Sequence, residues 1–138
     1  MIKQYILFSL FLFFIACELK VEESGIPDVA IDLEINLNDI DNTDLKLIGG
    51  YKYFAGGVRG IIVYHESMNT YKAYDRNCTF QPEDACAIVE VHTSGFYIED
   101  TCCKSTFDLN GFPTGGPALF PLKEYRVSLA GDILFVFN

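Results

Sequence analysis

A strict alternation of apolar and polar residues near the start of the chain constrains its fold more than any other feature. Between residues 29 and 37, every second side chain is apolar: Val29, Ile31, Leu33, Ile35 and Leu37. This period of two places the apolar side chains on one face of an extended strand. The pattern therefore predicts a β-strand with one buried face.

Several more short β segments follow, separated by turn residues. The sequence predicts hairpins over residues 51–65 around Gly56-Gly57, over 87–99 around residues 93–95, and over 126–137 around Gly131-Asp132. Asn110-Gly111 is a further turn signal, and residues 38–44 read as a polar loop. No helical periodicity follows residue 17, so the 138-residue chain is expected to form one all-β domain, an antiparallel sandwich or small barrel.

The amino terminus predicts export and a lipid anchor. Residues 1–16 carry one charge, Lys3, ahead of an apolar run that is too short to be retained as a membrane span. Ala16 followed by Cys17 resembles a bacterial lipoprotein cleavage site, although Phe14 and Ile15 depart from its strictest form. We therefore expect a signal peptide at 1–16, an acylated Cys17 with a polar tether to residue 27, and a domain at 28–138. An ordinary secretory signal is the alternative.

The net charge of the chain limits the classes of partner that it can bind, and the residue after Cys17 indicates its location. The net charge is −9, and no run of basic residues exists, which disfavours nucleic acid as a partner. The expected partner is a membrane, reached through the acyl chains on Cys17. Glu18 is not the usual residue for inner-membrane retention, so we expect the outer membrane.

Four cysteines remain once Cys17 is assigned to lipid: Cys78, Cys86, Cys102 and Cys103. An even number in an exported chain favours disulfides. Of the three possible pairings, the one that joins the neighbours Cys102 and Cys103 strains the backbone, and two remain open. A zinc site with four thiolates is disfavoured because the spacing lacks paired Cys-x-x-Cys motifs. Free thiols are the third alternative.

Motifs in the second half of the chain resemble the Rieske domain. They are Ser105-Thr106-Phe107-Asp108, Gly111, Gly116-Pro117-Ala118, and Pro121-Leu122 followed by Tyr125. The order of segments from 26 to 138 is also similar to that family, and in particular to exported Rieske-like lipoproteins that lack the cluster. The resemblance implies a Rieske-type β fold.

The resemblance also identifies the positions at which a Rieske protein holds its [2Fe-2S] cluster with two cysteines and two histidines. Cys78 falls on the first cysteine, Phe80 on the first histidine, Asp100 on the second cysteine and Cys103 on the second histidine. Because only one ligand is retained, we expect neither a cluster nor another metal. The chain's two histidines lie outside both loops; we expect His92 at the surface and His65 half-buried.

The resemblance further implies how the cysteines pair. Many Rieske proteins join their two ligand loops by a disulfide, and Cys102 with Cys86 matches that bond. Cys78 and Cys103 then stand at facing ligand positions and are expected to form a second disulfide. Each bond would stabilise the fold by about 3 kcal/mol.

No motif for a nucleophile, a metalloprotease or a phosphate loop is present, so we do not expect an enzyme. The favoured function is a membrane-tethered, non-catalytic structural or protein-binding module. Phe112, Pro113 and Phe120 could form an apolar partner patch at the tip, or simply cover the core. The alternatives are a Rieske-type electron carrier and a thiol redox module with an atypical site.

Overall fold

A computed structural model describes residues 24–138. The predicted signal peptide, Cys17 and the first part of the predicted tether lie outside these residues. Within residues 24–138, no helix has the length and apolar character needed to cross a bilayer.

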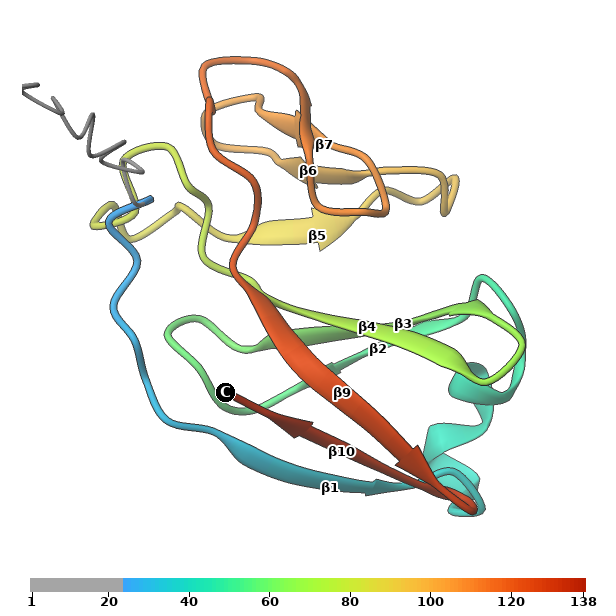
Figure 1. The fold of residues 1–138 in the computed structure, drawn as a ribbon. Helices are drawn as coiled ribbons and strands as arrows, with labels where there is room; N and C mark the ends of the chain where they lie inside the picture. Colours follow the sequence, from blue (N-terminus) through green and yellow to red (C-terminus); the bar gives the residue numbers. More distant parts are fainter. Residues whose placement is uncertain (1–23) are drawn as a thin grey trace, which may run out of the picture.

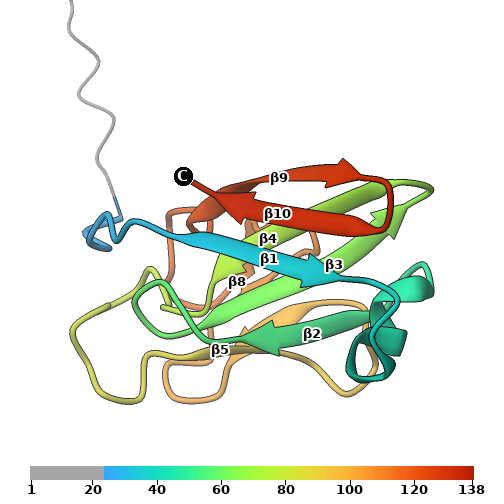
Figure 2. The same ribbon diagram turned by 90° about the horizontal axis from the view of Figure 1, so that it is seen from below.

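The larger of two sheets has six strands: β1 (Asp32–Asn36), β2 (Tyr51–Phe54), β3 (Ile61–Ser67), β4 (Thr70–Asp75), β9 (Glu124–Ala130) and β10 (Ile133–Phe137). Their order is β1-β10-β9-β4-β3-β2, and every neighbouring pair is antiparallel. The sheet curls, so that β1, β10 and β9 form one layer and β4, β3 and β2 the next (Figures 1 and 2). The predicted antiparallel all-β fold is confirmed.

The smaller sheet lies between β4 and β9 in the sequence and contains β5 (Val89–Val91), β6 (Ile98–Asp100), β7 (Thr106–Phe107) and β8 (Pro113–Gly115). These strands are antiparallel and follow one another in chain order. Figure 1 shows this sheet as a third layer, above β2, β3 and β4. It carries the second cysteine segment, directly after β6.

Strand β3 separates two hydrophobic cores. Ile61 and Val63 pack in the core inside the curled large sheet, whereas Ile62 packs in the core under the small sheet. All three side chains are fully buried. The continuous apolar run Ile-Ile-Val is what a strand covered on both faces requires, because its alternate side chains enter different cores.

A 3-10 helix, η1 (Ile40–Lys46), takes the place of most of the predicted polar loop. Its single strongly apolar anchor is Leu45, which is fully buried, and the Tyr71 hydroxyl donates a hydrogen bond to the Leu45 carbonyl oxygen. Asn42 is also buried but polar, so a single buried apolar side chain in seven residues leaves no helical period in the sequence. The prediction of a loop was therefore wrong here, because tertiary contacts rather than a repeating pattern hold this turn.

The buried carboxylate of Asp75 fixes the end of β4. It accepts hydrogen bonds from the backbone N–H groups of Val58, Arg59 and Asn77 and from the Tyr125 hydroxyl. Gly57 adopts a φ of 60°, and a Cβ there would lie 2.3 Å from Asp75 Oδ2. Only glycine lets the backbone approach the carboxylate this closely.

The chain enters the domain beside the first cysteine loop (Figure 1). Gly25 packs near Pro82 of that loop, and Ile26, within the predicted tether, is buried. Lys123 Nζ then donates hydrogen bonds to the Pro27 carbonyl oxygen and to Asp28. The start of the described chain and the cysteine loops therefore lie at the same end of the molecule.

Candidate functional site

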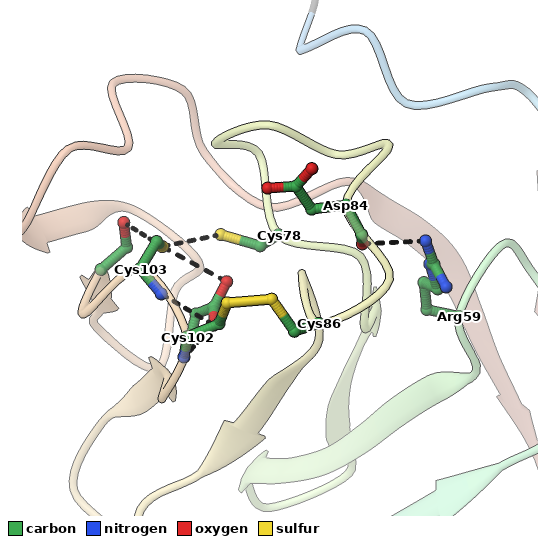
Figure 3. Close-up of a disulfide and its surroundings, with 8 residues drawn as sticks. Arg59, Cys78, Asp84, Cys86, Cys102 and Cys103 are labelled. Carbon is green, nitrogen blue, oxygen red and sulfur yellow. Dashed lines mark hydrogen bonds between the residues drawn. A yellow bond between two sulfur atoms is a disulfide. The ribbon is translucent and has the colours of Figure 1, made fainter.

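The first cysteine loop extends from the end of β4 to the start of β5. The Cys78 N–H donates a hydrogen bond to the Ala87 carbonyl oxygen, and the Ala87 N–H donates to the Asp84 carbonyl oxygen. Arg59 lies in the turn between β2 and β3 of the large sheet. Its guanidinium also donates a hydrogen bond to the Asp84 carbonyl oxygen (Figure 3). These bonds hold Cys78, which is fully buried, at the inner side of the loop.

The second cysteine loop is a tight turn organised by Asp100. Its backbone accepts a hydrogen bond from the Lys104 N–H and donates one to the Ser105 carbonyl oxygen. Its carboxylate Oδ1 accepts from the backbone N–H groups of Cys102 at 2.7 Å and Cys103 at 3.4 Å. Lys104 closes the turn with a φ of 65°. The carboxylate thus replaces the backbone partners that a turn leaves unpaired.

A disulfide between Cys86 and Cys102 joins the two loops (Figure 3). Both residues are exposed, so the bond closes the outer side of the tip. This pairing agrees with the one implied by the Rieske resemblance.

The second expected disulfide is not formed. Cys78 and Cys103 are both free thiols, with their sulfur atoms 3.7 Å apart. That is a contact distance, well beyond the roughly 2.05 Å of a disulfide bond. The Cys103 thiol instead contacts Asp100 Oδ2 at 3.3 Å and Ser105 Oγ at 3.0 Å. The prediction of a second disulfide was therefore wrong, because Asp100 and Ser105 hold the Cys103 sulfur in place as a thiol.

Burial raises the pKa of the Cys78 thiol well above its ordinary value. The Asp100 carboxylate and the Cys103 sulfur act in the same direction, and the Phe80 backbone N–H acts against them. In this environment, without a cation, Cys78 stays protonated at neutral pH.

Cys78, Asp100 and Cys103 form a compact group of ligand atoms. One donor atom from each lies within 4.8 Å of the other two, and this is the one such group of His, Cys and carboxylate side chains found within residues 24–138. A cavity of about 170 Å³ adjoins it, lined by Asp100, Cys103 and Phe80 among others. Three of the four predicted ligand positions are therefore brought together, and the fourth, Phe80, lies beside them.

These residues do not fit a [2Fe-2S] cluster. Phe80 offers no ligand atom, and a Rieske cluster needs four ligands on two irons. By their positions, Cys78 and Cys103 would bind different irons, yet their sulfur atoms are in direct contact at 3.7 Å. Two irons and the sulfides that bridge them cannot lie between atoms in contact.

Both histidines are far from this group along the strands. His65 pairs with Tyr71 at the start of β4, whereas Cys78 follows the end of β4. It stacks on Tyr71 and is 7% exposed, so it is buried rather than half-buried as predicted. His92 is partly exposed and bonded to Ser94 in the β5–β6 turn, at the opposite end of that hairpin from Asp100.

Of the three apolar residues predicted to form a contact patch, Phe112 is 59% exposed and Phe120 is half-buried. The Leu122 N–H donates a hydrogen bond to the Gly111 carbonyl oxygen, so the segments that carry Phe112 and Phe120 lie side by side. The Phe120 carbonyl oxygen also accepts a hydrogen bond from Thr79 in the first cysteine loop. Pro113 begins β8 and is half-buried. The exposed apolar side chain at the cysteine end is Leu119, which sequence reasoning missed; it is 80% exposed.

Sequence reasoning also missed Asp75, although a signal was present. Asp75 is the last residue of β4 and lies beside the predicted Gly56-Gly57 turn, where small residues permit a close backbone approach. By contrast, a cavity of about 640 Å³, lined by Asp44 and residues 47–53, contains no sulfur ligand. Volume and ligand chemistry therefore point to different ends of the molecule, and we place the site at the cysteines.

No protein-family model and no curated protein sequence matches the chain. Among solved structures, the ferredoxin of carbazole 1,9a-dioxygenase from Nocardioides aromaticivorans IC177 is similar, with a TM-score of 0.50 and 18% sequence identity. The alignment covers 79% of this chain and 97% of that chain. At this identity the similarity concerns the fold alone. The chain therefore has the all-β fold of a Rieske-type ferredoxin, as its motifs predicted.

Proposed function

We propose that the protein is an outer-membrane-anchored, non-catalytic binding module that keeps a Rieske-type fold without a [2Fe-2S] cluster. The observation that carries this proposal is the tip itself. The Cys86–Cys102 disulfide joins the two loops, while Phe80 and the contacting sulfurs of Cys78 and Cys103 fill the place of a cluster.

Protein groups hold the loops without a cluster. Asp100 accepts the backbone N–H groups of its own turn, and Arg59 binds the first loop from the large sheet. A cross-link over 16 residues adds about 3 kcal/mol by restricting the unfolded chain. A tip held in this way can present a fixed surface to a partner.

The path of the chain supports a partner close to the membrane. Seven residue steps separate Cys17 from Ser24, and an extended chain spans at most about 25 Å over that number. Gly25 packs near Pro82 of the first cysteine loop, so an anchor at Cys17 would keep this end of the domain near the bilayer. Leu119, exposed at the same end, is the apolar contact that we propose for a membrane-proximal protein.

Electron transfer is the competing function, because the similar solved structure is a ferredoxin. That role requires a redox centre, and the residues at the tip do not fit the cluster. The test is an absorption spectrum and a low-temperature paramagnetic-resonance spectrum of the full chain purified in detergent, before and after dithionite reduction, with iron and acid-labile sulfide analysis. We expect no reducible cluster signal; a stoichiometric one would overturn the proposal.

Partner binding has its own test. Cross-linking in intact membranes, followed by purification of the full chain, should capture a reproducible protein that Leu119→Asp loses. Phe112→Asp is the matched control, since it changes another exposed apolar side chain at the other end of β8. Equal capture by the wild type and both variants would contradict the assignment of the surface.

A further inference from the structure

Two thiols and one carboxylate converge at the tip, beside the disulfide but outside it. The Cys78 and Cys103 sulfurs are 3.7 Å apart, and Asp100 Oδ2 lies 3.3 Å from the Cys103 sulfur. Cys78 and Asp100 are almost completely buried, at 0% and 1% exposure. Cys103 beside them is half-buried. Burying such donors around one point carries a cost unless a common partner compensates them.

Two of the three separations match the edges of a tetrahedron around one metal ion, and the third, from Cys78 to Asp100, is within 4.8 Å. With Zn–S bonds of about 2.3 Å and a Zn–O bond of about 2.0 Å, tetrahedral geometry sets sulfurs about 3.8 Å apart and sulfur and oxygen about 3.5 Å apart. The observed separations are 3.7 Å for Cys78 to Cys103 and 3.3 Å for Cys103 to Asp100. One ion therefore fits where two irons do not.

The surrounding groups orient these donors. The backbone N–H groups of Cys102 and Cys103 bind Asp100 Oδ1, which leaves Oδ2 directed at the sulfurs. Ser105 Oγ lies 3.0 Å from the Cys103 sulfur and accepts a hydrogen bond from the Ala118 N–H at 3.1 Å. That bond leaves the Ser105 hydroxyl proton free to point at a thiolate. Outer-sphere partners of this kind are what metal sites use to fix their ligands.

The adjoining cavity supplies a route to the site and room for a fourth ligand. It measures about 170 Å³ and is lined also by Gln81 and Asp84 of the first loop. A water molecule fits in this volume, so three protein ligands with one open position is the arrangement that results.

We propose that Cys78, Asp100 and Cys103 bind one thiophilic divalent cation, of the Zn²⁺ class, with the fourth position open to the cavity. Sulfur ligands select zinc over magnesium or calcium, which prefer oxygen. Binding converts both thiols to thiolates and releases their two protons to solvent, so the site carries two thiolates, one carboxylate and one dication. This site is distinct from a [2Fe-2S] centre and stands whether or not the proposed partner surface is correct.

The test uses the full chain in detergent, purified without reductant so that Cys86–Cys102 stays closed. After chelator treatment under argon, the protein is titrated with Zn²⁺ against a chromophoric chelator, and separately with Co²⁺. We expect one ion per chain, thiolate-to-cobalt charge-transfer bands in the near ultraviolet, and the visible bands of a tetrahedral site. Besides Cys17, which counts as a further thiol if it is not acylated, two thiols should be counted in the metal-free, unfolded chain.

Matched variants separate the ligands from their surroundings. Cys103→Ser and Asp100→Asn should weaken Zn²⁺ binding by more than the roughly 10- to 100-fold that loss of an outer-sphere partner costs, and Ser105→Ala should fall within that range. Glu99→Gln is the control, because Glu99 precedes Asp100 in β6 and points to the other face of the sheet. It should leave the affinity within about twofold.

Three results would overturn the proposal: no stoichiometric Zn²⁺ binding by the wild type, a cobalt spectrum without thiolate bands, or a thiol count of zero besides Cys17 that shows Cys78 bonded to Cys103. The cobalt spectrum of the unmodified chain decides the matter even if a variant fails to fold. Iron–sulfide analysis remains a separate measurement, so a failure here leaves the test of the proposed function intact.

Discussion

The two sheets of this domain are stabilised by different means. The large sheet has strands of four to seven residues around a mainly aliphatic core. Each strand pairs with at least one neighbour along most of its length, although β4 and β9 share only two residue pairs. The small sheet has strands of two or three residues, and its core includes Cys78 and the ring of Phe107. Ladders this short cannot hold a sheet on their own, so the disulfide and the Asp100 turn contribute what the backbone does not.

The two sheets are therefore specified by the sequence in different ways. Burial in the large sheet is repetitive and tolerant, because each strand adds similar apolar area. In the small sheet, single side chains such as Asp100 and Cys102 stabilise the structure, and each has a specific partner. Substitutions should therefore have graded effects in one region and discrete effects in the other.

The largest expected effect lies at the joint between the two sheets. Asp75→Asn removes the charge that three backbone N–H groups and the Tyr125 hydroxyl bind, and it turns an amide NH₂ toward donors. We expect a loss of about 3 kcal/mol or more in the free energy of unfolding, measured by urea denaturation. Both sheets should unfold in one transition at the lower midpoint. Tyr125→Phe, which removes one donor, should cost about 1 kcal/mol; equal losses in the two variants would contradict this account.

The next effect should be confined to the small sheet. Replacing Cys86 and Cys102 together by serine should cost about 3 kcal/mol, because the unfolded chain regains the freedom of the closed loop. Native-state hydrogen exchange should speed up at the amides of Val89 and Asp100 more than at Leu134 in the large sheet. A uniform acceleration at all three amides would show that the two sheets do not differ in this respect.

A third comparison uses one glycine from each sheet. Gly116, after β8, and Gly131, between β9 and β10, both have positive φ, 79° and 61°. A Cβ at Gly116 would lie 2.5 Å from the Lys104 carbonyl oxygen, whereas one at Gly131 meets nothing within 4 Å. Gly131→Ala should cost about 1 kcal/mol in unfolding free energy for the backbone conformation alone, and Gly116→Ala about 1 kcal/mol or more beyond that. Equal costs would refute the packing role of Gly116.

The smallest expected effect is a dependence of the unfolding free energy on pH that arises from Asp28, just before β1. Hydrogen bonds from Lys123 and Asn138, and the charge of Lys123, hold the pKa of Asp28 below its ordinary value of 3.8. A depressed pKa in the folded state stabilises the fold above the unfolded pKa, and this contribution is lost as the pH falls through the folded value. The stability difference between the wild type and Asp28→Asn should therefore be constant at neutral pH and shrink below pH 3.8. Because Asp28 is exposed, the difference should be small; a difference that grows with acidity would contradict the sign.

The success of prediction from the sequence also differs between the large sheet and the cysteine tip. The hairpin at 126–137 agrees with β9 and β10 because alternating apolar residues and a Gly-Asp turn specify it locally. The 3-10 helix η1 was missed, since Leu45 is its single large anchor. The tip was predicted in part: the Cys86–Cys102 bond follows from a resemblance, whereas the contact between the free thiols of Cys78 and Cys103 does not.

The thiol pair shows why a count of cysteines is not enough. Four cysteines in a chain expected to be exported suggested two disulfides, and residues 24–138 contain one. What the count omits is Asp100 and Ser105, whose oxygens contact the Cys103 sulfur. Because these partners come from a turn and a short strand, no spacing rule for cysteines includes them.

The hydrogen bonds of Asn138 also affect how the domain would resist a pulling force. The Asn138 side chain bonds Asp28, the Val29 carbonyl oxygen and the Ile31 N–H, just before β1 pairs with β10 over five residue pairs. Ladder hydrogen bonds run perpendicular to the strands, so a pull along β1 loads all of them in shear rather than one at a time. A domain tethered by its amino-terminal segment would thus resist pulling with its strongest geometry, and the Asn138 side chain would add three hydrogen bonds ahead of the ladder.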